Sequence, residues 1–220
     1  FSLLRVRILE KRYSYLIDAY SSLYYLDKTE CKSEYDVSWA FKYLEDFLEQ
    51  LEQARKRYMN KILRPDIERI MLNEICHYND YIVKLARYAM PQSVKLDEYN
   101  DLDRKQVVNI YVGDYRADNV IVYKEDTRIK NSGDIKSWLE GKYENAYESE
   151  VLKDLDLSNG DYQDINLSHC NFSGSNLSGS SFKNSLLIGT VFNNTNLDGV
   201  KFENANLSYS DMRGAILKNA

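Results

Sequence analysis

The sequence has few of the residues from which metal and catalytic sites are most often built. Its three cysteines, Cys31, Cys76 and Cys170, are widely spaced and odd in number. They indicate neither a disulfide framework nor a zinc site, so a reducing, cytoplasmic compartment is the expected location. With two histidines, no glycine-rich phosphate loop and no nucleophile elbow, most common active sites cannot be assembled. We therefore expect a protein that is not an enzyme and binds no cofactor.

Long apolar segments are absent as well. No stretch of eighteen apolar residues and no secretory signal is present. The chain opens on FSLLRVRILEKR without an initiator methionine, so we expect upstream sequence. Whether that sequence contains a signal or a membrane span is left undecided. The basic cluster of this segment is interpreted as a solvated helix face, with the cytoplasmic flank of a membrane span as the alternative. The cluster comprises Arg5, Arg7, Lys11 and Arg12.

An excess of positive charge is also missing. The chain has 29 Lys and Arg residues against 34 Asp and Glu residues, a net charge of −5. Residues 1–90 contain 15 basic and 14 acidic residues in thorough mixture. Binding to nucleic-acid phosphates needs a dominant basic face, so no direct nucleic-acid partner is expected.

A five-residue period runs from residue 155 to residue 217, with one large residue at every fifth position and a mostly small residue two places before it. This period fits neither a helix nor a flat strand, and it indicates an internal repeat. We predict a solenoid of square coils whose large residues point inward, with residues twenty apart stacked at about 4.8 Å. The predicted inward residues are Leu157, Tyr162, Leu167, Phe172, Leu177, Phe182, Leu187, Phe192, Leu197, Phe202, Leu207, Met212 and Leu217.

The units SNLSG (175–179), TNLDG (195–199) and ANLSY (205–209) resemble the pentapeptide-repeat family, whose unit is approximately Ala-Asp/Asn-Leu-X-X. The resemblance implies a right-handed quadrilateral β-helix over the last third of the chain. Leu186 and Val191 depart from the unit because they replace the polar residue before the inward position. We expect them either to be covered by another part of the chain or to form an exposed contact patch.

The first 90 residues show helical periodicity. Apolar residues recur at spacings of three and four in segments 1–26, 37–63 and 66–90. An antiparallel three-helix bundle is the economical arrangement. A capping-box spacing and a proline mark the starts of the second and third helices, at Ser33, Asp36 and Pro65.

The segment between bundle and repeat is expected to hold a β-hairpin and a capping helix. Residues 107–112 and 119–123 have strand character, with Gly113 and Asp114 in the turn. A helix at residues 135–147 is predicted to plug the N-terminal end of the solenoid. Ser132 or Asp134 is expected to cap the start of this helix. Its plugging side chains are expected to be Trp138, Leu139 and Tyr143. The expected fold is therefore α+β. It consists of a helical bundle at residues 1–90, a linker with β-hairpin and capping helix at residues 91–150, and a β-helix at residues 151–220.

A partial metal motif lies in the third helical segment. Glu74 and His77 have the Glu-x-x-His spacing of carboxylate-bridged di-iron bundles. Such a site needs two histidines, and the second, His169, lies in the repeat. We interpret these residues as ordinary helix-surface groups and expect no metal. The acidic residues on the neighbouring helix are Glu45, Glu49 and Glu52.

These observations favour a scaffold whose solenoid displays a binding surface and whose helical domain engages an unidentified protein partner. One alternative, implied by the resemblance, is modulation of a type II topoisomerase by DNA mimicry. A solenoid about 16 Å long would need on the order of nine net negative charges for that. Residues 151–220 carry seven acidic and five basic residues, a net charge of −2. The other alternative is the soluble part of a membrane protein or a secreted bacterial effector.

The end of the sequence leaves the last coil without a cap. Ala220 falls where the small residue of a fourteenth unit belongs. We expect either that further coils or a cap follow, or that two chains stack end to end through the open coil as a homodimer.

Overall fold

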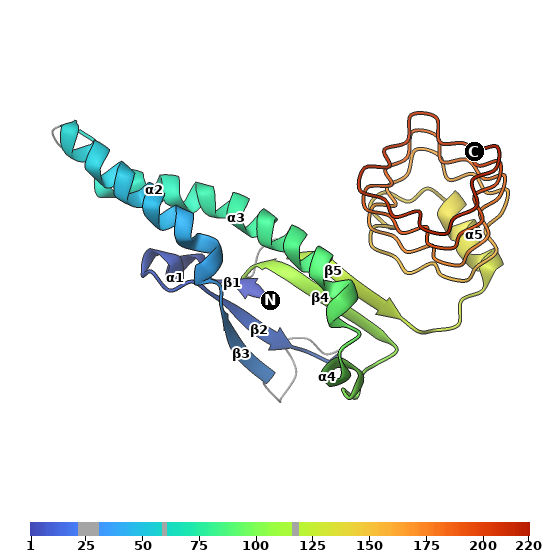
Figure 1. The fold of residues 1–220 in the computed structure, drawn as a ribbon, viewed down its shortest axis with the longest axis horizontal. Helices are drawn as coiled ribbons and strands as arrows, with labels where there is room; N and C mark the ends of the chain where they lie inside the picture. Colours follow the sequence, from blue (N-terminus) through green and yellow to red (C-terminus); the bar gives the residue numbers. More distant parts are fainter. Residues whose placement is uncertain (22–30, 59–60, 116–118) are drawn as a thin grey trace. The chain divides into compact units, whose positions relative to one another are not determined.

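The computed structural model describes residues 1–21, 31–58, 61–115 and 119–220 (Figure 1). The chain forms two compact units. Unit 1 comprises Phe1–Asp103 and Asn109–Tyr123, and unit 2 comprises Arg104–Val108 and Lys124–Ala220. The division passes through the β-hairpin and does not fall at residues 90 and 150, because each hairpin strand contributes residues to both units.

Unit 1 is built around a five-stranded sheet with the strand order β3-β2-β1-β4-β5. β1 pairs antiparallel with β2 and parallel with β4, and β2 pairs antiparallel with β3. Ser2 of β1 lies opposite Gly113 of β4, so the sheet depends on contacts between residues far apart in the sequence. The strands are β1 (Ser2–Leu3), β2 (Ser14–Ala19), β3 (Cys31–Asp36), β4 (Val107–Asp114) and β5 (Asn119–Asp126).

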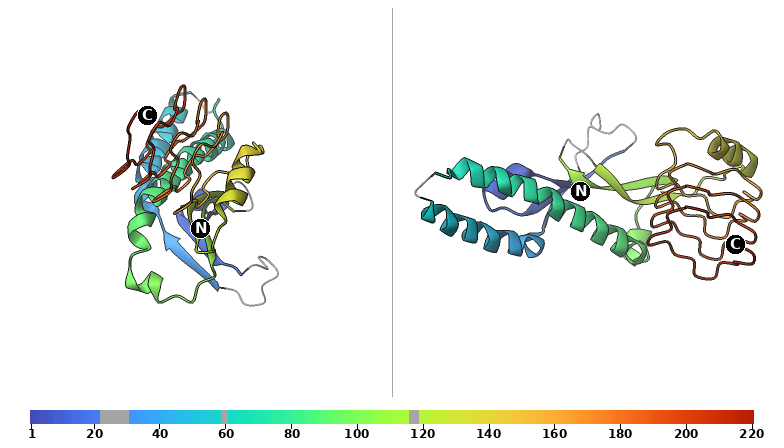
Figure 2. Two further views of the ribbon diagram at one scale, coloured as in Figure 1. Left: turned by 90° about the vertical axis from the view of Figure 1, so that its right-hand side faces the viewer. Right: turned by 90° about the horizontal axis from the view of Figure 1, so that it is seen from above.

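Two long helices, α2 (Ser38–Arg57) and α3 (Arg64–Ser93), lie side by side over one face of the sheet (Figures 1 and 2). Their buried side chains, among them Phe41 and Ile75, share one core with Leu3 and Tyr15 of the sheet. Two short helices complete unit 1, α1 (Arg5–Leu9) and α4 (Asp97–Asn100). Among the described residues, no helix is both long and apolar enough to cross a membrane.

The predicted three-helix bundle is wrong, because its first helix does not form. The described part of segment 1–26 contains β1, α1 and β2, and residues 22–26 lie outside the described residues. Tyr13 and Tyr15 are buried while Ser14 between them is half-exposed, an alternation of period two that the helical interpretation missed. Aromatic and β-branched residues favour strands once neighbouring strands can pair with them. The second and third predicted helices are confirmed as α2 and α3, with Pro65 in the first turn of α3.

Two local predictions in unit 1 also need correction. Ser33 lies inside β3, whereas Asp36 accepts a hydrogen bond from the Ser38 N–H at 2.7 Å beside the start of α2. Gly113 and Asp114 are the last residues of β4, so the hairpin turn begins after them. The two predicted hairpin strands are confirmed as β4 and β5.

Unit 2 contains a stack of coils (Figures 1 and 2), whose sides are five residues long according to the spacing of the backbone bridges. Parallel backbone bridges join residues twenty apart, for example Asn176 to Asn196 and Leu186 to Asn206. Twenty residues therefore make one turn, as the repeat predicts. The second residue after each inward residue has a left-handed backbone, such as Asn159 with φ of 54°. Asn, Asp and Gly dominate this corner position because they tolerate that conformation best.

Helix α5 (Ser132–Glu140) supplies the plug of the coil core. Leu139 is fully buried in the core and Trp138 packs against it. Tyr143, which was expected to help, is 60% exposed. Tyr147 takes its place, since it is buried and its ring meets the Trp138 ring edge-on with centroids 4.7 Å apart. The plug therefore combines a helix with a residue of the first coil.

The start and end of α5 also differ from the prediction. Asn131 is the N-cap, and its side-chain oxygen accepts hydrogen bonds from the N–H groups of Gly133 at 2.8 Å and Asp134 at 3.1 Å. The predicted caps Ser132 and Asp134 lie inside the first turn. The helix ends at Glu140, before Tyr147, because the chain then turns into the first coil.

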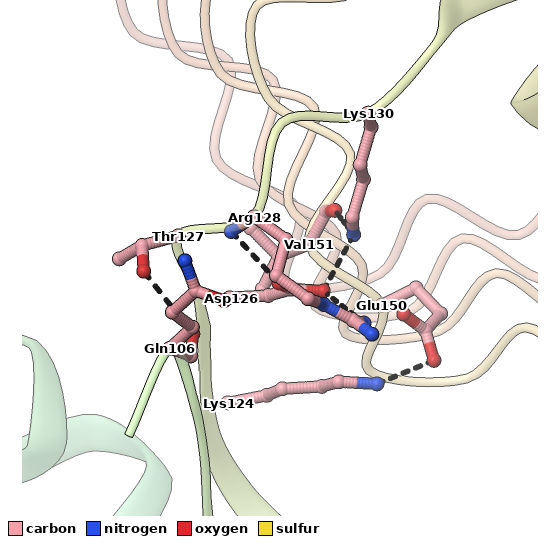
Figure 3. A network of polar contacts seen from close by, with 8 residues as sticks. All are labelled: Gln106, Lys124, Asp126, Thr127, Arg128, Lys130, Glu150 and Val151. Carbon is pink, nitrogen blue, oxygen red and sulfur yellow. Dashed lines mark hydrogen bonds and ion pairs between the residues drawn. The ribbon is translucent and has the colours of Figure 1, made fainter. Parts of the chain in front are cut away.

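A network of charged side chains connects the end of β5 to the first coil within unit 2 (Figure 3). The Asp126 carboxylate is inaccessible to solvent, and it pairs with Arg128 at 2.8 Å and with Lys130 at 3.0 Å. Lys130 also donates a hydrogen bond to the backbone carbonyl of Val151. The hydrogen bonds from Arg128, and then those from Lys130, hold the pKa of Asp126 well below its ordinary value. The connection therefore depends on a charged carboxylate.

Candidate protein-interaction surface on the coils

The interior of the coils is a column of stacked side chains. The rings of Phe172 and Phe192 lie nearly parallel with centroids 5.6 Å apart, and those of Phe182 and Phe202 are 5.8 Å apart. The two stacks meet edge-on, for instance at 6.3 Å between Phe172 and Phe182. Offset stacking and edge-on contacts are the favoured arrangements of aromatic rings. The column therefore holds each coil in register with the next.

A ladder of buried hydroxyl groups reinforces this register. Each hydroxyl donates a hydrogen bond to the backbone carbonyl 23 residues earlier, at 2.6 to 3.0 Å. A buried hydroxyl without a partner would destabilise the fold, so these bonds explain why polar residues are tolerated inside. The ladder comprises Ser175, Ser180, Ser185, Thr190 and Thr195.

The outward residues are ordered as well. The side-chain amide of Asn196 donates to Asn176 at 3.0 Å, and that of Asn176 donates to Asp156 at 3.1 Å. A second file runs along a corner, where Asn184 donates to Asp164 at 2.9 Å. These bonds join side chains twenty residues apart and fix the outer surface together with the core. The coils therefore present their outward side chains on a rigid frame.

Charge is distributed unevenly over the four sides of the coils. Over three successive coils, one side, made of residues 166–169, 186–189 and 206–209, contains no Asp, Glu, Lys or Arg, whereas in the first coil the same side has the exposed Glu148. We call it the neutral face. All seven acidic and five basic residues of the segment 151–220 lie on the other three sides. On an adjoining side, hydrogen bonds from Arg213 lower the pKa of Asp211 to about 2, so that side stays charged at neutral pH.

Apolar side chains stand on the neutral face. Leu186 is 43% exposed and Tyr209 is 92% exposed, while Ile188 between them is half-buried. Val191 begins the adjoining side and is half-buried, between Asn171 and Asp211 in the bridge pattern. Of the two residues predicted as a contact patch, Leu186 therefore presents the larger surface. An uncharged area with exposed apolar side chains has the composition of a protein contact surface.

Comparison with known families identifies the coils. Residues 152–187 and 180–219 match the family model for pentapeptide repeats, in eight copies. The C-terminal region of this chain is a pentapeptide-repeat domain. No curated protein matches the chain.

Two solved structures, both of pentapeptide repeat proteins, are similar to part of the chain. One is HetL, a pentapeptide repeat protein involved in heterocyst differentiation regulation in the cyanobacterium Nostoc sp. strain PCC 7120. It is 19% identical, with a TM-score of 0.25, over 30% of this chain and 40% of HetL. The other is Rfr23 from the cyanobacterium Cyanothece 51142, which is 26% identical with a TM-score of 0.21 over 33% of this chain. The matched region spans 60% of Rfr23, so the likeness covers only part of each protein.

Burial along the pentapeptide-repeat domain follows the position of each coil in the stack. Three of the predicted inward residues, Phe202, Leu207 and Met212, are half-buried, and Leu217 is 49% exposed. A coil is covered only by its neighbours, so burial falls towards the last coil of the chain. The fully buried inward residues are Leu157, Tyr162, Leu167, Phe172, Leu177, Phe182, Leu187, Phe192 and Leu197.

Sequence reasoning missed the first two members of the inward column. Tyr147 and Leu152 are buried and stand ten and five residues before Leu157, in the same register. The Tyr147 hydroxyl accepts a hydrogen bond from the Tyr143 N–H at 2.6 Å and donates one to the Trp138 carbonyl at 2.9 Å. Extending the five-residue period backwards would have found both. The polar residues around them obscured the signal.

The residues considered for metal chemistry belong to different units. Glu74 and His77 are on α3 in unit 1, whereas His169 is in the pentapeptide-repeat domain. No group of three or more His, Cys, Asp and Glu side chains within the described ranges is placed to hold a metal ion. Burial raises the pKa of the Cys170 thiol, which donates to the Tyr147 carbonyl at 2.9 Å. Cys170 is thus a neutral packing residue at the small inward position.

Proposed function

We propose that this chain is a non-enzymatic protein-interaction module whose pentapeptide-repeat domain presents the neutral face to a protein partner. The observation that carries the proposal is the absence of charge around the exposed Leu186 and Tyr209. Charged residues are depleted from the centres of protein interfaces and tyrosine is enriched there. Pentapeptide-repeat proteins often take part in protein–protein interactions, which agrees with this assignment.

The rigidity of the frame supports the same function. The stacked rings, the hydroxyl ladder and the asparagine files each connect residues about twenty positions apart. A surface that is already ordered loses little conformational entropy when a partner binds. The pentapeptide-repeat domain is therefore suited to present a small number of side chains in fixed positions.

The size of the neutral face limits the kind of contact it makes. Three coils at a spacing of about 4.8 Å give a strip about 10 Å tall. A stable protein interface covers about 800 Å² on each partner, which is more than this strip offers. We infer that Leu186 and Tyr209 form the centre of the contact and that polar groups of the adjoining sides form its rim.

Site-specific photocrosslinking tests the proposal. A Leu186→p-benzoylphenylalanine variant is expected to give a crosslinked protein in a lysate of the source organism. Excess unlabelled protein should abolish the crosslink, and an excess of the Leu186→Glu/Tyr209→Glu variant should not. Both positions are exposed, so circular dichroism should show an unchanged fold.

The matched control places the same crosslinker at Lys183, an outward position on a charged side. Equal crosslinking from positions 183 and 186, or equal competition by the double glutamate variant, would refute the assignment to the neutral face.

A further inference from the structure

A groove lined by aromatic side chains lies on unit 1, between α2 and α3. It has a volume of about 350 Å³ and is lined by Trp39, Ala40 and Tyr43 of α2 and by His77, Tyr78 and Tyr81 of α3. We call it the aromatic groove. Trp39 is 54% exposed, Tyr43 74% and Tyr81 54%, so three of its rings face solvent. Exposed aromatic residues gathered in a concave site mark a binding surface more often than isolated ones do.

The two helices determine where the residues of the groove lie. Trp39 and Tyr43 stand one helical turn apart on α2, and His77 and Tyr81 do so on α3, so each pair shares a helix face. The ring of Tyr78, which lines the groove, stacks on the ring of Phe41 with centroids 5.4 Å apart. Phe41 is itself fully buried in the core of unit 1. The groove is therefore part of the packed structure and needs no rearrangement to form.

The charges around the aromatic groove are mainly negative. Near the groove in the sequence, residues 34–49 contain five carboxylates and one lysine, and residues 71–84 contain two carboxylates and Lys84. The far end of α2 has the opposite sign, with Arg55, Lys56 and Arg57 in its last turn. Glu74 stands one helical turn before Tyr78 on α3, on the same helix face, and burial and then this carboxylate raise the pKa of Tyr78. A positively charged ligand fits this environment better than an anion.

We propose that the aromatic groove binds an arginine side chain of a partner protein, with the guanidinium stacked on the aromatic rings and Glu74 supplying the opposite charge. The faces of aromatic rings attract cations, and arginine does so most often among protein side chains. Its guanidinium is planar and weakly hydrated, so it stacks on rings at a lower desolvation cost than an ammonium group. The volume lies at the lower end of the range for ligand pockets and is sufficient for one side chain.

The inference rests on the proposed function in one respect, since it takes the partner to be a protein. It concerns unit 1, however, and is tested without the neutral face. The chain has two tryptophans, so a Trp138→Phe background leaves Trp39 as the single tryptophan, whose emission is excited selectively over that of tyrosine. The probe is the peptide acetyl-Gly-Arg-Gly-amide. The matched control is the same peptide with citrulline, which has the shape of arginine without its charge.

We expect a saturable change of Trp39 emission with the arginine peptide and about tenfold weaker binding of the citrulline peptide. Tyr81→Leu keeps an apolar side chain but removes a ring face, and should weaken arginine binding several-fold. Glu74→Gln should weaken it as well and reduce its dependence on salt. Tyr88→Leu is the matched control, because Tyr88 is 86% exposed on the same helix and does not line the groove.

Three results would overturn the inference: no saturable response to the arginine peptide, equal binding of both peptides, or equal effects of Tyr81→Leu and Tyr88→Leu. Circular dichroism should confirm that each variant is folded before its binding is measured. Crosslinking from position 186 is measured separately, so a negative result at the groove is distinguishable from a failure of the proposed function.

Discussion

Removal of the Phe182 ring tests whether the stacked column holds the coils together. Phe182 is fully buried, and its ring centroid lies 5.3 Å from that of Tyr162 and 5.8 Å from that of Phe202. Two further rings, Phe172 and Phe192, meet it edge-on at 6.3 and 6.4 Å. Phe182→Ala therefore removes four ring contacts at once and leaves a cavity in the middle of the stack.

The expected loss of stability is large. Phe→Ala substitutions in protein cores cost about 3 to 5 kcal/mol, and the cost is highest where the surroundings cannot collapse into the cavity. Backbone bridges from Ser181 to Asp161 and to Lys201 hold the adjacent coils apart at a fixed spacing. We therefore expect about 4 kcal/mol, which is a large part of the 5 to 15 kcal/mol that is typical of a whole domain.

Urea unfolding followed by tryptophan fluorescence measures this loss in unit 2. A Trp39→Phe background leaves Trp138, which packs against the end of the coil core, as the only reporter. Lys183→Ala is the matched control, because Lys183 pairs with Glu203 at 3.1 Å on the exposed surface and such pairs contribute about 1 kcal/mol or less. Equal unfolding midpoints for Phe182→Ala and Lys183→Ala would refute the inward register.

Three further predictions concern DNA mimicry, pH and self-association. Residues 151–220 have a net charge of only −2, which is too small to imitate DNA. We therefore expect that micromolar protein does not protect the supercoiling activity of gyrase from inhibition by a quinolone. Strong protection in that assay would contradict the proposed function. The lowered pKa of Asp126 contributes stability above the ordinary pKa of about 3.9, and this contribution is lost as the pH falls below that value. Asp126→Asn should therefore lower the free energy of unfolding of unit 2 by about 2 kcal/mol at pH 7, as measured by urea titration. In this variant the free energy of unfolding should also decrease less steeply below pH 4. A pH profile identical to that of the unsubstituted protein would argue against a stabilising role of the Asp126 carboxylate. Leu217 is 49% exposed in the last coil of the given sequence. We propose that the 220-residue polypeptide forms an end-to-end dimer, which sedimentation should show and Leu217→Arg should dissociate; a stable monomer would contradict this contact.

The candidate sites differ in how far the sequence could predict them. Leu186 stood out because it interrupts a regular polar position, and its exposure follows from the same register. The absence of charge on the neutral face could also have been found in the sequence by comparing residues twenty apart. The aromatic groove could not, because Trp39, Phe41 and Tyr43 all look alike in a helical pattern. Packing of α2 on the sheet and α3 decides that Phe41 is buried while its neighbours face solvent.

The pentapeptide-repeat domain was predictable because its contacts are nearly local. Most contacts of a five-residue unit are with units no more than about twenty residues away, so the period of large residues alone determines which side chains point inward. Even the missed start of the column, at Tyr147 and Leu152, obeys the same register. The sequence by itself therefore determined the coils, their inward column and the neutral face.

Only the tertiary structure decided the architecture of unit 1. Segment 1–26 has apolar spacings that suit a helix, yet β1 within it pairs with β4, where Ser2 lies opposite Gly113. A strand gains its stability from the neighbours with which it forms hydrogen bonds, and these neighbours are remote in the sequence. Local periodicity holds no information about such partners. The sheet, and with it the surface on which α2 and α3 form the aromatic groove, therefore depends on contacts that exist only in the folded chain.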